Sequence, residues 1–331
     1  MTPVTPGRTR LRRSVLWSAL AGGALYLVAI LLSDGPQVLA RIREIPPVWI
    51  PVVIGLPTLG FLLRFVRWDV FLRALGHDLP RLRHLRIYLA GFALTATPGK
   101  VGENLRAVSL SAYGVPTSHS LAAFIAERLG DVVAMVLLSG LAVHLFAEQG
   151  WLVAASTVAT LAALWFVRRP GVPARLRDLA PAAGLGRRAV LGVAQVLTVA
   201  ADLLSPRLLF LGVGIALLAW GAEGLTFGLL ARLMGVEVAI PAALGIFAVA
   251  TLLGAVSFLP GGVGPTEAVM VGLLTVAGAT LPQATAATLL VRAATLWWAV
   301  LLGIVALMGL DAGGSSPAGP ALPDSGGDAG A

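Results

Sequence analysis

Long apolar runs separated by short polar, arginine-rich segments dominate the chain. Six runs are continuous and approach or exceed the roughly 20 residues with which a helix crosses about 30 Å of hydrocarbon. These runs are residues 14–33, 48–66, 120–147, 151–167, 207–230 and 285–308. They are too long for the strands of a membrane barrel, which need about 9–11 residues each. The pattern therefore predicts an all-α polytopic membrane protein with about six full spans.

Two further apolar stretches, residues 87–113 and 241–280, are broken in the middle by proline and glycine. We interpret each as a helical hairpin that either dips into the membrane or crosses it and returns. With the six spans, the hairpins form one predicted transmembrane domain over residues 14–309. Residues 310–331 are rich in Gly, Ala, Pro and Ser without apolar periodicity, which predicts a disordered tail.

The composition supports a membrane protein and narrows its chemistry. Hydrophobic residues make up 57% of the chain, charged residues 12%, and the mean hydropathy is +0.89. The chain contains no cysteine, which excludes disulfides, thiolate metal sites and thiol nucleophiles. Its four histidines form no metal-binding motif, so we expect no metal and no other cofactor. Phosphate-binding loops, nucleophile elbows and dinucleotide fingerprints are also missing, so we expect no enzyme.

The net charge of +8 raises the question of nucleic acid, but the arginines lie between apolar runs, where the positive-inside rule places them. Alternate connecting segments carry sixteen and three Lys or Arg residues. The richer set comprises residues 1–13, 64–86 and 168–188, and includes Arg64 and Arg67; the poorer set comprises residues 34–47, 148–150, 232–240 and 281–284. This asymmetry predicts a cytoplasmic-membrane protein with the basic N-terminus, residues 1–13, and the C-terminus in the cytoplasm.

A short motif occurs twice, once in each predicted hairpin. TPGKVGE at residues 97–103 matches LPGGVGPTE at residues 259–267, and each copy ends on a glutamate, Glu103 or Glu267. A span follows each copy and carries an arginine, Arg128 or Arg292, 30 or 32 residues after the motif's proline. The matching turn residues are Pro98, Gly99 and Gly102 in the first copy and Pro260, Gly261 and Gly264 in the second.

Each motif thus belongs to a larger unit of span, hairpin and arginine-bearing span, about residues 48–147 and 207–309. The charge count gives the two units opposite orientations, so they are predicted inverted repeats. Inverted repeats with broken hydrophobic segments are typical of transporters whose site lies near the membrane midplane, between the repeats.

The two span arginines define the candidate chemistry. At about 1.5 Å of rise per residue, Arg128 and Arg292 lie roughly 14 Å along their helices. An arginine near the bilayer centre costs about 2.5–3.5 kcal/mol, so each needs a partner. Arg128 can pair with Asp131 on the same helical face, and the other carboxylates available are Glu103, Glu127, Glu223 and Glu267.

Two interpretations of these charges remain open. In one, the hairpin glutamates neutralise the arginines and lock the hairpins in place. In the other, Arg128 and Arg292, together with Lys100 and Arg106, contact a phosphate that passes between the units. Lys100 and Arg106 can alternatively extend towards the cytoplasmic headgroups.

The segments TPGKVGENLRAVSL, AERLGD, LPGGVGPTEA and VRAATLWW, in this order, resemble the flippase-like family, the transmembrane region of lysylphosphatidylglycerol synthases. The resemblance covers about residues 15–309. It implies movement of lipid between leaflets, and it carries over to twelve positions: Pro98, Gly99, Gly102, Glu103, Arg106, Arg128, Asp131, Pro260, Gly261, Gly264, Glu267 and Arg292. Full-length synthases add a soluble aminoacyltransferase domain that this sequence lacks, so lipid aminoacylation is not implied.

From the residues and the resemblance together we expect a flippase for an anionic or amphiphilic lipid of the phospholipid or polyprenyl phosphate class. We expect no nucleic acid partner. Two alternatives stay open: a non-transporting membrane partner of an envelope-synthesis enzyme, and an intramembrane lipid-linked transferase that uses Glu103, Asp131 or Glu267.

Overall fold

The computed structural model describes residues 36, 40, 42–95, 103, 106–142 and 150–312. Several predictions fall outside these residues: the span at residues 14–33, the turn residues Pro98, Gly99 and Gly102, the candidate Lys100, and nearly all of the tail. Throughout the described ranges the chain is helical and has no strand, as the apolar pattern predicts.

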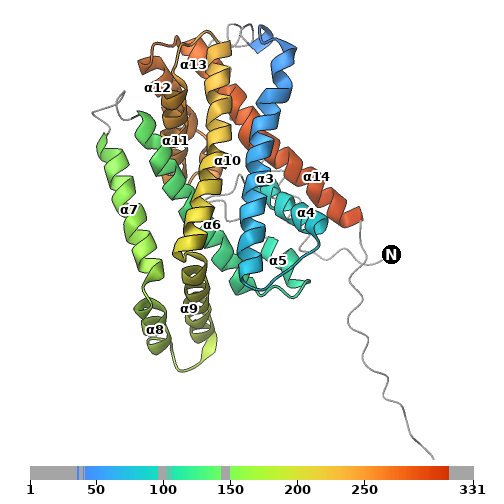
Figure 1. The fold of residues 1–331 in the computed structure, drawn as a ribbon, viewed down its shortest axis with the longest axis vertical. Helices are drawn as coiled ribbons and strands as arrows, with labels where there is room; N and C mark the ends of the chain where they lie inside the picture. The colour runs from blue at the N-terminus through green and yellow to red at the C-terminus, as the bar shows by residue number, and fades with distance from the viewer. Residues whose placement is uncertain are drawn as a thin grey trace, which may run out of the picture.

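Two long helices, α3 (Ile50–Ala74) and α10 (Pro206–Leu233), pack side by side along the long axis of the molecule (Figure 1). A short 3₁₀ turn, η1 (Pro47–Trp49), leads into α3. The two helices approach closely because Gly60 has no side chain: a Cβ there would lie 2.9 Å from the carbonyl oxygen of Ala219. This antiparallel pair is the axis against which the other elements pack.

A third long segment runs from α13 (Leu281–Arg292) through a π-helical turn, η7 (Ala293–Trp297), into α14 (Trp298–Ala312). Three continuous helical segments are long and apolar enough to cross a membrane, namely Pro47–Ala74, Pro206–Leu233 and Leu281–Leu310. They correspond to three of the predicted spans.

Two more predicted spans are helical, but neither meets this criterion of length and apolarity within the described residues. Residues 120–147 correspond to α6 (Thr117–Ser139) and the 3₁₀ turn η4 (Gly140–Ala142). Residues 151–167 correspond to α7 (Gly150–Arg168), in which the stretch Ala154–Arg168 is apolar. Three charged side chains, Glu127, Arg128 and Asp131, lie in the middle of α6 and lower its hydropathy. That α6 and α7 cross the membrane stays a prediction.

The second predicted hairpin is confirmed, and we call it hairpin 2. It comprises α11 (Ile240–Val256), the 3₁₀ turn η6 (Pro260–Gly262) and α12 (Pro265–Val276). The chain reverses at the predicted positions: Gly261 and Gly264 have φ of 62° and 98°, values that residues with a Cβ rarely adopt.

Hairpin 1 begins earlier in the chain than predicted. Its first arm is α4 (Arg81–Gly91), continued by the 3₁₀ turn η2 (Phe92–Leu94), and its second arm is the short helix α5 (Arg106–Ser111). Glu103 lies against the end of α4, because a Cβ on Gly91 would be 3.0 Å from the Glu103 carbonyl oxygen. The glutamate therefore sits where the two arms meet.

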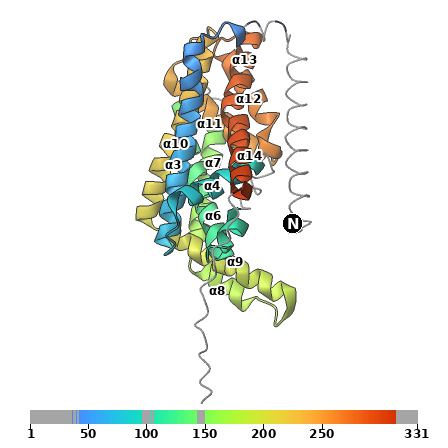
Figure 2. The ribbon, with the colours of Figure 1, turned by 90° about the vertical axis from the view of Figure 1, so that its right-hand side faces the viewer.

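The two hairpins belong to different cores near opposite ends of the α3–α10 pair. Hairpin 1 packs with the second half of α3 around Trp68 and Leu72, and the amphipathic helix α9 (Gly184–Leu203), which packs on α6, contributes to the same core. Hairpin 2 packs with the second half of α10 around Phe227 and Leu230, and with α13. Figure 2 shows α12 and α13 towards one end of the molecule, and α9 with the short helix α8 (Gly171–Asp178) towards the other.

The prediction that Arg64 and Arg67 lie in a cytoplasmic connection is wrong. Helix α3 extends to Ala74, well beyond the predicted end of the span at residue 66, and it buries both arginines. The apolar residues Trp68, Phe71 and Leu72 continue the buried face of the helix around them. Without these two arginines, fourteen of the sixteen remain in the richer set, so the charge asymmetry persists.

Candidate functional site

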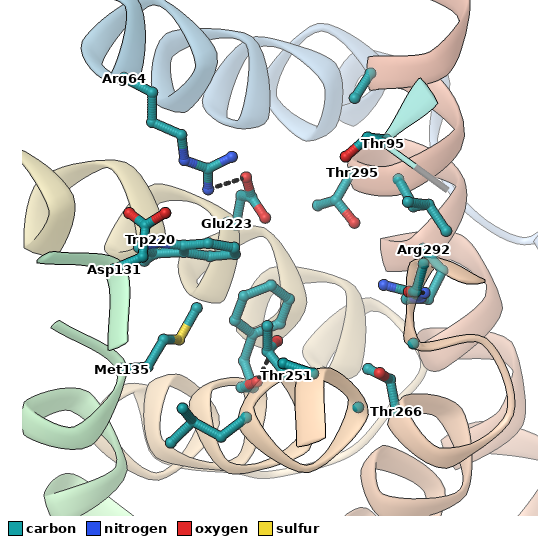
Figure 3. Close-up of a pocket in the computed structure, with 18 of the residues that line it drawn as sticks. Arg64, Thr95, Asp131, Met135, Trp220, Glu223, Thr251, Thr266, Arg292 and Thr295 are labelled. Carbon is teal, nitrogen blue, oxygen red and sulfur yellow. Dashed lines mark hydrogen bonds and ion pairs between the residues drawn. The ribbon is translucent and has the colours of Figure 1, made fainter. Parts of the chain in front are cut away.

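A cavity of about 190 Å³ lies where the two hairpins approach the α3–α10 pair. Hairpin 1 contributes Phe92, Thr95 and Glu103 to its wall, and hairpin 2 contributes residues from Phe247 to Thr266. Figure 3 shows Arg64, Asp131 and Trp220 on one side of the cavity and Thr266, Arg292 and Thr295 on the other. Three arginines and three carboxylates line it: Arg64, Arg128, Arg292, Glu103, Asp131 and Glu223. The cavity is therefore charged but formally balanced.

The two long helices supply one buried ion pair to this wall. Arg64 Nη2 of α3 donates to Glu223 Oε1 of α10 at 2.6 Å (Figure 3). The Arg64 guanidinium also lies over the Trp220 ring, 3.9 Å from its centroid, in a cation–π contact. Glu223, a predicted site residue, thus lies in the site, whereas its partner Arg64 is not foreseen from the sequence.

Asp131 of α6 is a carboxylate of the cavity wall with three partners on three helices. Its Oδ1 accepts from Arg67 Nη2 at 2.8 Å and from Trp220 Nε1 at 3.0 Å. Its Oδ2 lies 3.1 Å from Arg128 Nη2, so the predicted pairing of Arg128 with Asp131 on one helical face is confirmed. Asp131 therefore joins α3, α6 and α10.

Glu127, one turn earlier on α6, is fully buried between two arginines. Its Oε2 lies 3.3 Å from Arg106 Nη2, and its Oε1 lies 3.6 Å from Arg67 Nη2. Arg67 itself is only 1% exposed. A buried carboxylate needs such partners, because an isolated ion in a low-dielectric interior is strongly destabilising.

Glu103 brings hairpin 1 into the same set of charges. Its carboxylate accepts from Thr95 Oγ1 at 2.6 Å and lies 3.3 Å from Arg106 Nη2 and 3.9 Å from Arg128 Nη2. Arg106 is buried, with its guanidinium 4.1 Å from the Trp68 ring centroid. The interpretation in which Arg106 reaches the headgroups is therefore wrong. We call Arg67, Arg106, Arg128, Glu103, Glu127 and Asp131 the hairpin 1 cluster.

Arg292 binds the turn of hairpin 2 at two points. Its Nε donates to Glu267 Oε1 at 2.6 Å, and its Nη2 donates to the Gly261 carbonyl oxygen at 2.7 Å. Glu267 Oε2 also accepts from the Gly264 backbone N–H at 2.6 Å, which satisfies a free donor at the start of α12. The predicted pairing of the hairpin glutamate with the span arginine is thus confirmed here.

Sequence reasoning misses Arg64, Arg67 and Trp220 and gives Glu127 no site role. The signal for the two arginines is the apolar spacing of Phe61, Trp68 and Phe71, which continues the helix past residue 66. Trp220 has no comparable signal, because a tryptophan in a span is equally compatible with contact to lipid.

The arrangement places guanidinium groups beside the cavity. Arg64, Arg128 and Arg292 line it, and a quarter of the Arg128 side chain is exposed. Within the described part of the chain, no group of three His, Asp or Glu side chains converges as a metal site would require. Arginine donors suit a phosphate or carboxylate.

Comparison with known proteins relates the chain to a family of membrane proteins. The sequence model of the lysylphosphatidylglycerol synthase TM region matches residues 19–303. A UPF0104 membrane protein of Methanothermobacter thermautotrophicus is 25% identical over 312 residues, which cover 86% of this chain and 92% of that protein.

Proposed function

The chain belongs to the family of the lysylphosphatidylglycerol synthase transmembrane region, and from this we propose that it is a lipid translocase. In this proposal it moves an anionic or amphiphilic lipid between the leaflets of the cytoplasmic membrane. One observation carries the proposal: charged residues associated with both hairpins, Glu103 and Arg128 on one side and Arg292 on the other, line a single cavity.

A headgroup crosses the hydrocarbon slowly because its charges must leave water. A path lined with fixed charges lowers that cost, since each ionic group of the lipid meets a partner within the protein. Arg128 is the best candidate for the first residue to contact the lipid headgroup. A quarter of its side chain is exposed, while the other members of the hairpin 1 cluster are almost fully buried. In the proposal, a phosphate replaces a carboxylate as the partner of Arg128 and then of Arg292.

The packing of the hairpins supports the inverted relation that the sequence predicts. Hairpin 1 packs with the second half of α3 and hairpin 2 with the second half of α10. Because these two helices are antiparallel, the hairpins belong to opposite ends of the bundle. We infer that the hairpins give access to the cavity from opposite sides of the membrane, with both termini in the cytoplasm.

The proposed substrate carries a phosphate, as anionic phospholipids and polyprenyl phosphates do. We propose no chemical step, because Glu103, Asp131 and Glu267 are each engaged with an arginine and none is placed as a free acid or base. The transferase alternative predicts that Asp131→Asn abolishes product formation while lipid still binds. The alternative of a partner for an envelope-synthesis enzyme predicts stable copurification without lipid exchange.

The test is leaflet exchange of a fluorescent phospholipid and of a labelled polyprenyl phosphate in proteoliposomes. We expect wild-type protein to accelerate exchange of at least one of them over empty vesicles. Arg128→Ala and Arg292→Ala should each lower the rate by about tenfold or more, equivalent to about 1.4 kcal/mol of barrier.

Arg187→Ala is the matched control, because Arg187 is exposed on α9 and does not line the cavity. It should exchange lipid at the wild-type rate. Wild-type protein that moves neither lipid faster than empty vesicles would contradict the proposal, and so would Arg128→Ala and Arg292→Ala variants that retain full activity.

A further inference from the structure

The cavity has its exposed wall at the tip of hairpin 2. Among the residues described as lining it, Ala255 and Leu259 are exposed and all the others are buried or half-buried. Ala255 lies in the last turn of α11, and Leu259 directly precedes η6. Among the described residues, the cavity wall is therefore most exposed at these two residues.

This tip is apolar and exposed. Val256 is 71% exposed, Phe258 72% and Leu259 46%. Exposed apolar side chains of a membrane protein are suited to contact lipid chains. The tip follows 17 residues of α11, about 25 Å at 1.5 Å per residue, so it lies deep along the bundle.

The shape of the tip is held in place by specific contacts. Phe258 has a φ of 53°, a left-handed conformation that is unusual for an aromatic residue. Ser257 Oγ donates to the Gly254 carbonyl at 2.6 Å and accepts from the Leu259 N–H at 3.2 Å. Strain of this kind persists only where the surroundings impose it, and it is concentrated at functional positions.

The cavity is too small to enclose a whole lipid. Its 190 Å³ is below the roughly 300–1,000 Å³ of pockets that enclose drug-sized ligands. That space accommodates a small phosphorylated headgroup, but not acyl or prenyl chains. A lipid bound by its headgroup must therefore leave its chains outside, and the exposed wall at Ala255 and Leu259 offers them an exit.

We propose that the apolar chains of the translocated lipid lie in the opening between Ala255 and Leu259 while its headgroup occupies the charged cavity. This inference rests on the proposed function and adds to it the route of the chains and a limit on headgroup size. Hairpin 2 is then the side of the protein through which the lipid enters laterally.

Because the chain has no cysteine, one introduced thiol tests the opening. Purified Ala255→Cys protein is labelled in detergent with a bulky maleimide, and the extent of labelling is measured by mass spectrometry before reconstitution. The label should lower lipid exchange by about tenfold or more relative to the same unlabelled variant. Val276→Cys is the control, because Val276 is 69% exposed at the far end of α12 and does not line the cavity. Labelling it should leave exchange within about twofold.

Labelled Ala255→Cys protein that exchanges lipid within about twofold of the unlabelled form would overturn the inference while leaving the translocase proposal intact. A second measurement does not depend on transport. A phospholipid with a photoreactive group in its acyl chain should crosslink to the peptide that contains residues 255–259, and Arg128→Ala should reduce this crosslink because the headgroup is no longer held. Crosslinks near Phe210, which is 84% exposed on α10, should not change. If Arg128→Ala lowers crosslinking equally at both peptides, residues 255–259 contact lipid no more specifically than Phe210 does, and the inference is refuted.

Discussion

The two hairpins hold their arginines in different ways. In the hairpin 1 cluster, three arginines and three carboxylates from α3, α5, α6 and the hairpin turn share their partners. At hairpin 2, Arg292 binds one carboxylate and one backbone carbonyl within the hairpin itself. Disrupting the hairpin 1 cluster would disturb several helices, whereas the Arg292 contacts join the turn of hairpin 2 to α13.

From this difference we expect the two hairpins to have different roles. The shared cluster fixes the position of charges on one side of the cavity, in keeping with the rule that catalytic and binding groups need rigid support. The simpler contact at hairpin 2 adjoins the exposed tip at Phe258. We therefore expect hairpin 1 to be the rigid half of the protein and hairpin 2 the half that moves.

The largest expected effect comes from removing a shared cation of the hairpin 1 cluster. Arg67→Leu leaves Glu127 and Asp131 with one fewer positive partner at a site that excludes water. Breaking such a buried set costs about 3–5 kcal/mol. Thermal unfolding in detergent should show a large loss of stability or no folded protein.

Arg73→Ala is the control, since Arg73 is partly exposed and its ion pairs lie at the surface. Equal stability of the two variants would contradict the expectation that the buried ion pairs contribute more to stability than the exposed ones.

A smaller effect is expected where α14 crosses hairpin 1. A Cβ at Gly303 would overlap the backbone of Phe92 and Ala93, which cannot rotate away. Gly303→Ala should therefore cost about 1–3 kcal/mol, the usual range for overpacking. Gly254→Ala in hairpin 2 meets mainly the Thr266 side chain and should cost less.

The control for both glycine variants is Gly272→Ala, because nothing lies within 4 Å of a Cβ at that helical position. Its stability should equal or exceed that of the wild type. If Gly254→Ala destabilises the protein more than Gly303→Ala does, hairpin 1 is not the more tightly packed of the two.

A modest effect is expected from neutralising the contact at hairpin 2. Glu267→Gln keeps an acceptor for Arg292 but loses the charge that strengthens the hydrogen bond. The loss should be about 1–2 kcal/mol of stability. Proteolysis or hydrogen exchange at the tip should increase, while the peptides of α6 stay protected. Uniform deprotection of both regions would show that the hairpins do not open independently.

The smallest expected effect is the pH dependence of stability that arises from His77, a residue outside the predicted spans. His77, just after α3, contacts His119 at 2.8 Å between ring nitrogens. Burial, and secondarily the nearby His119, lower the pKa of His77 below its ordinary value. The unfolded chain therefore takes up a proton at this position more readily, near pH 6.5, and stability falls as the pH drops below that value. We expect the melting temperature to fall by less than about 2 °C between pH 7.5 and 5.5. The fall should be smaller in His77→Gln. A larger fall in that variant would show that other groups cause the pH dependence of stability.

Much of the arrangement was predictable because membranes restrict backbone polar groups. The apolar runs indicate α3, α10 and the α13–α14 segment, and the Pro and Gly motif marks the turn of hairpin 2. The pairing of Arg128 with Asp131 follows from helical spacing. Arg64 and Arg67 were not predicted, because arginines near the end of an apolar run look the same whether they face the cytoplasm or a buried carboxylate.

Contacts between residues far apart in the sequence also could not be predicted from the spacing of residues. Arg64 and Glu223 are 159 residues apart, and only the packing of α3 on α10 brings them together. The tip at Phe258 is similar: its motif predicts a turn, but which of its residues are exposed depends on the helices around it.

The π-helical turn η7 sets the rotational phase between the two halves of the last long segment. It immediately follows Arg292, which binds hairpin 2, and it precedes α14, whose Gly303 lies against hairpin 1. A π-turn accommodates one residue more than the α-helix would, and one residue corresponds to about 100° of helical rotation. Deletion of a single residue from 293–297 would therefore allow a regular α-helix through this turn and keep the Arg292 and Gly303 contacts nearly in phase. Deletion of one residue from 298–302, in the regular helix that follows, would instead rotate Gly303 away from Ala93.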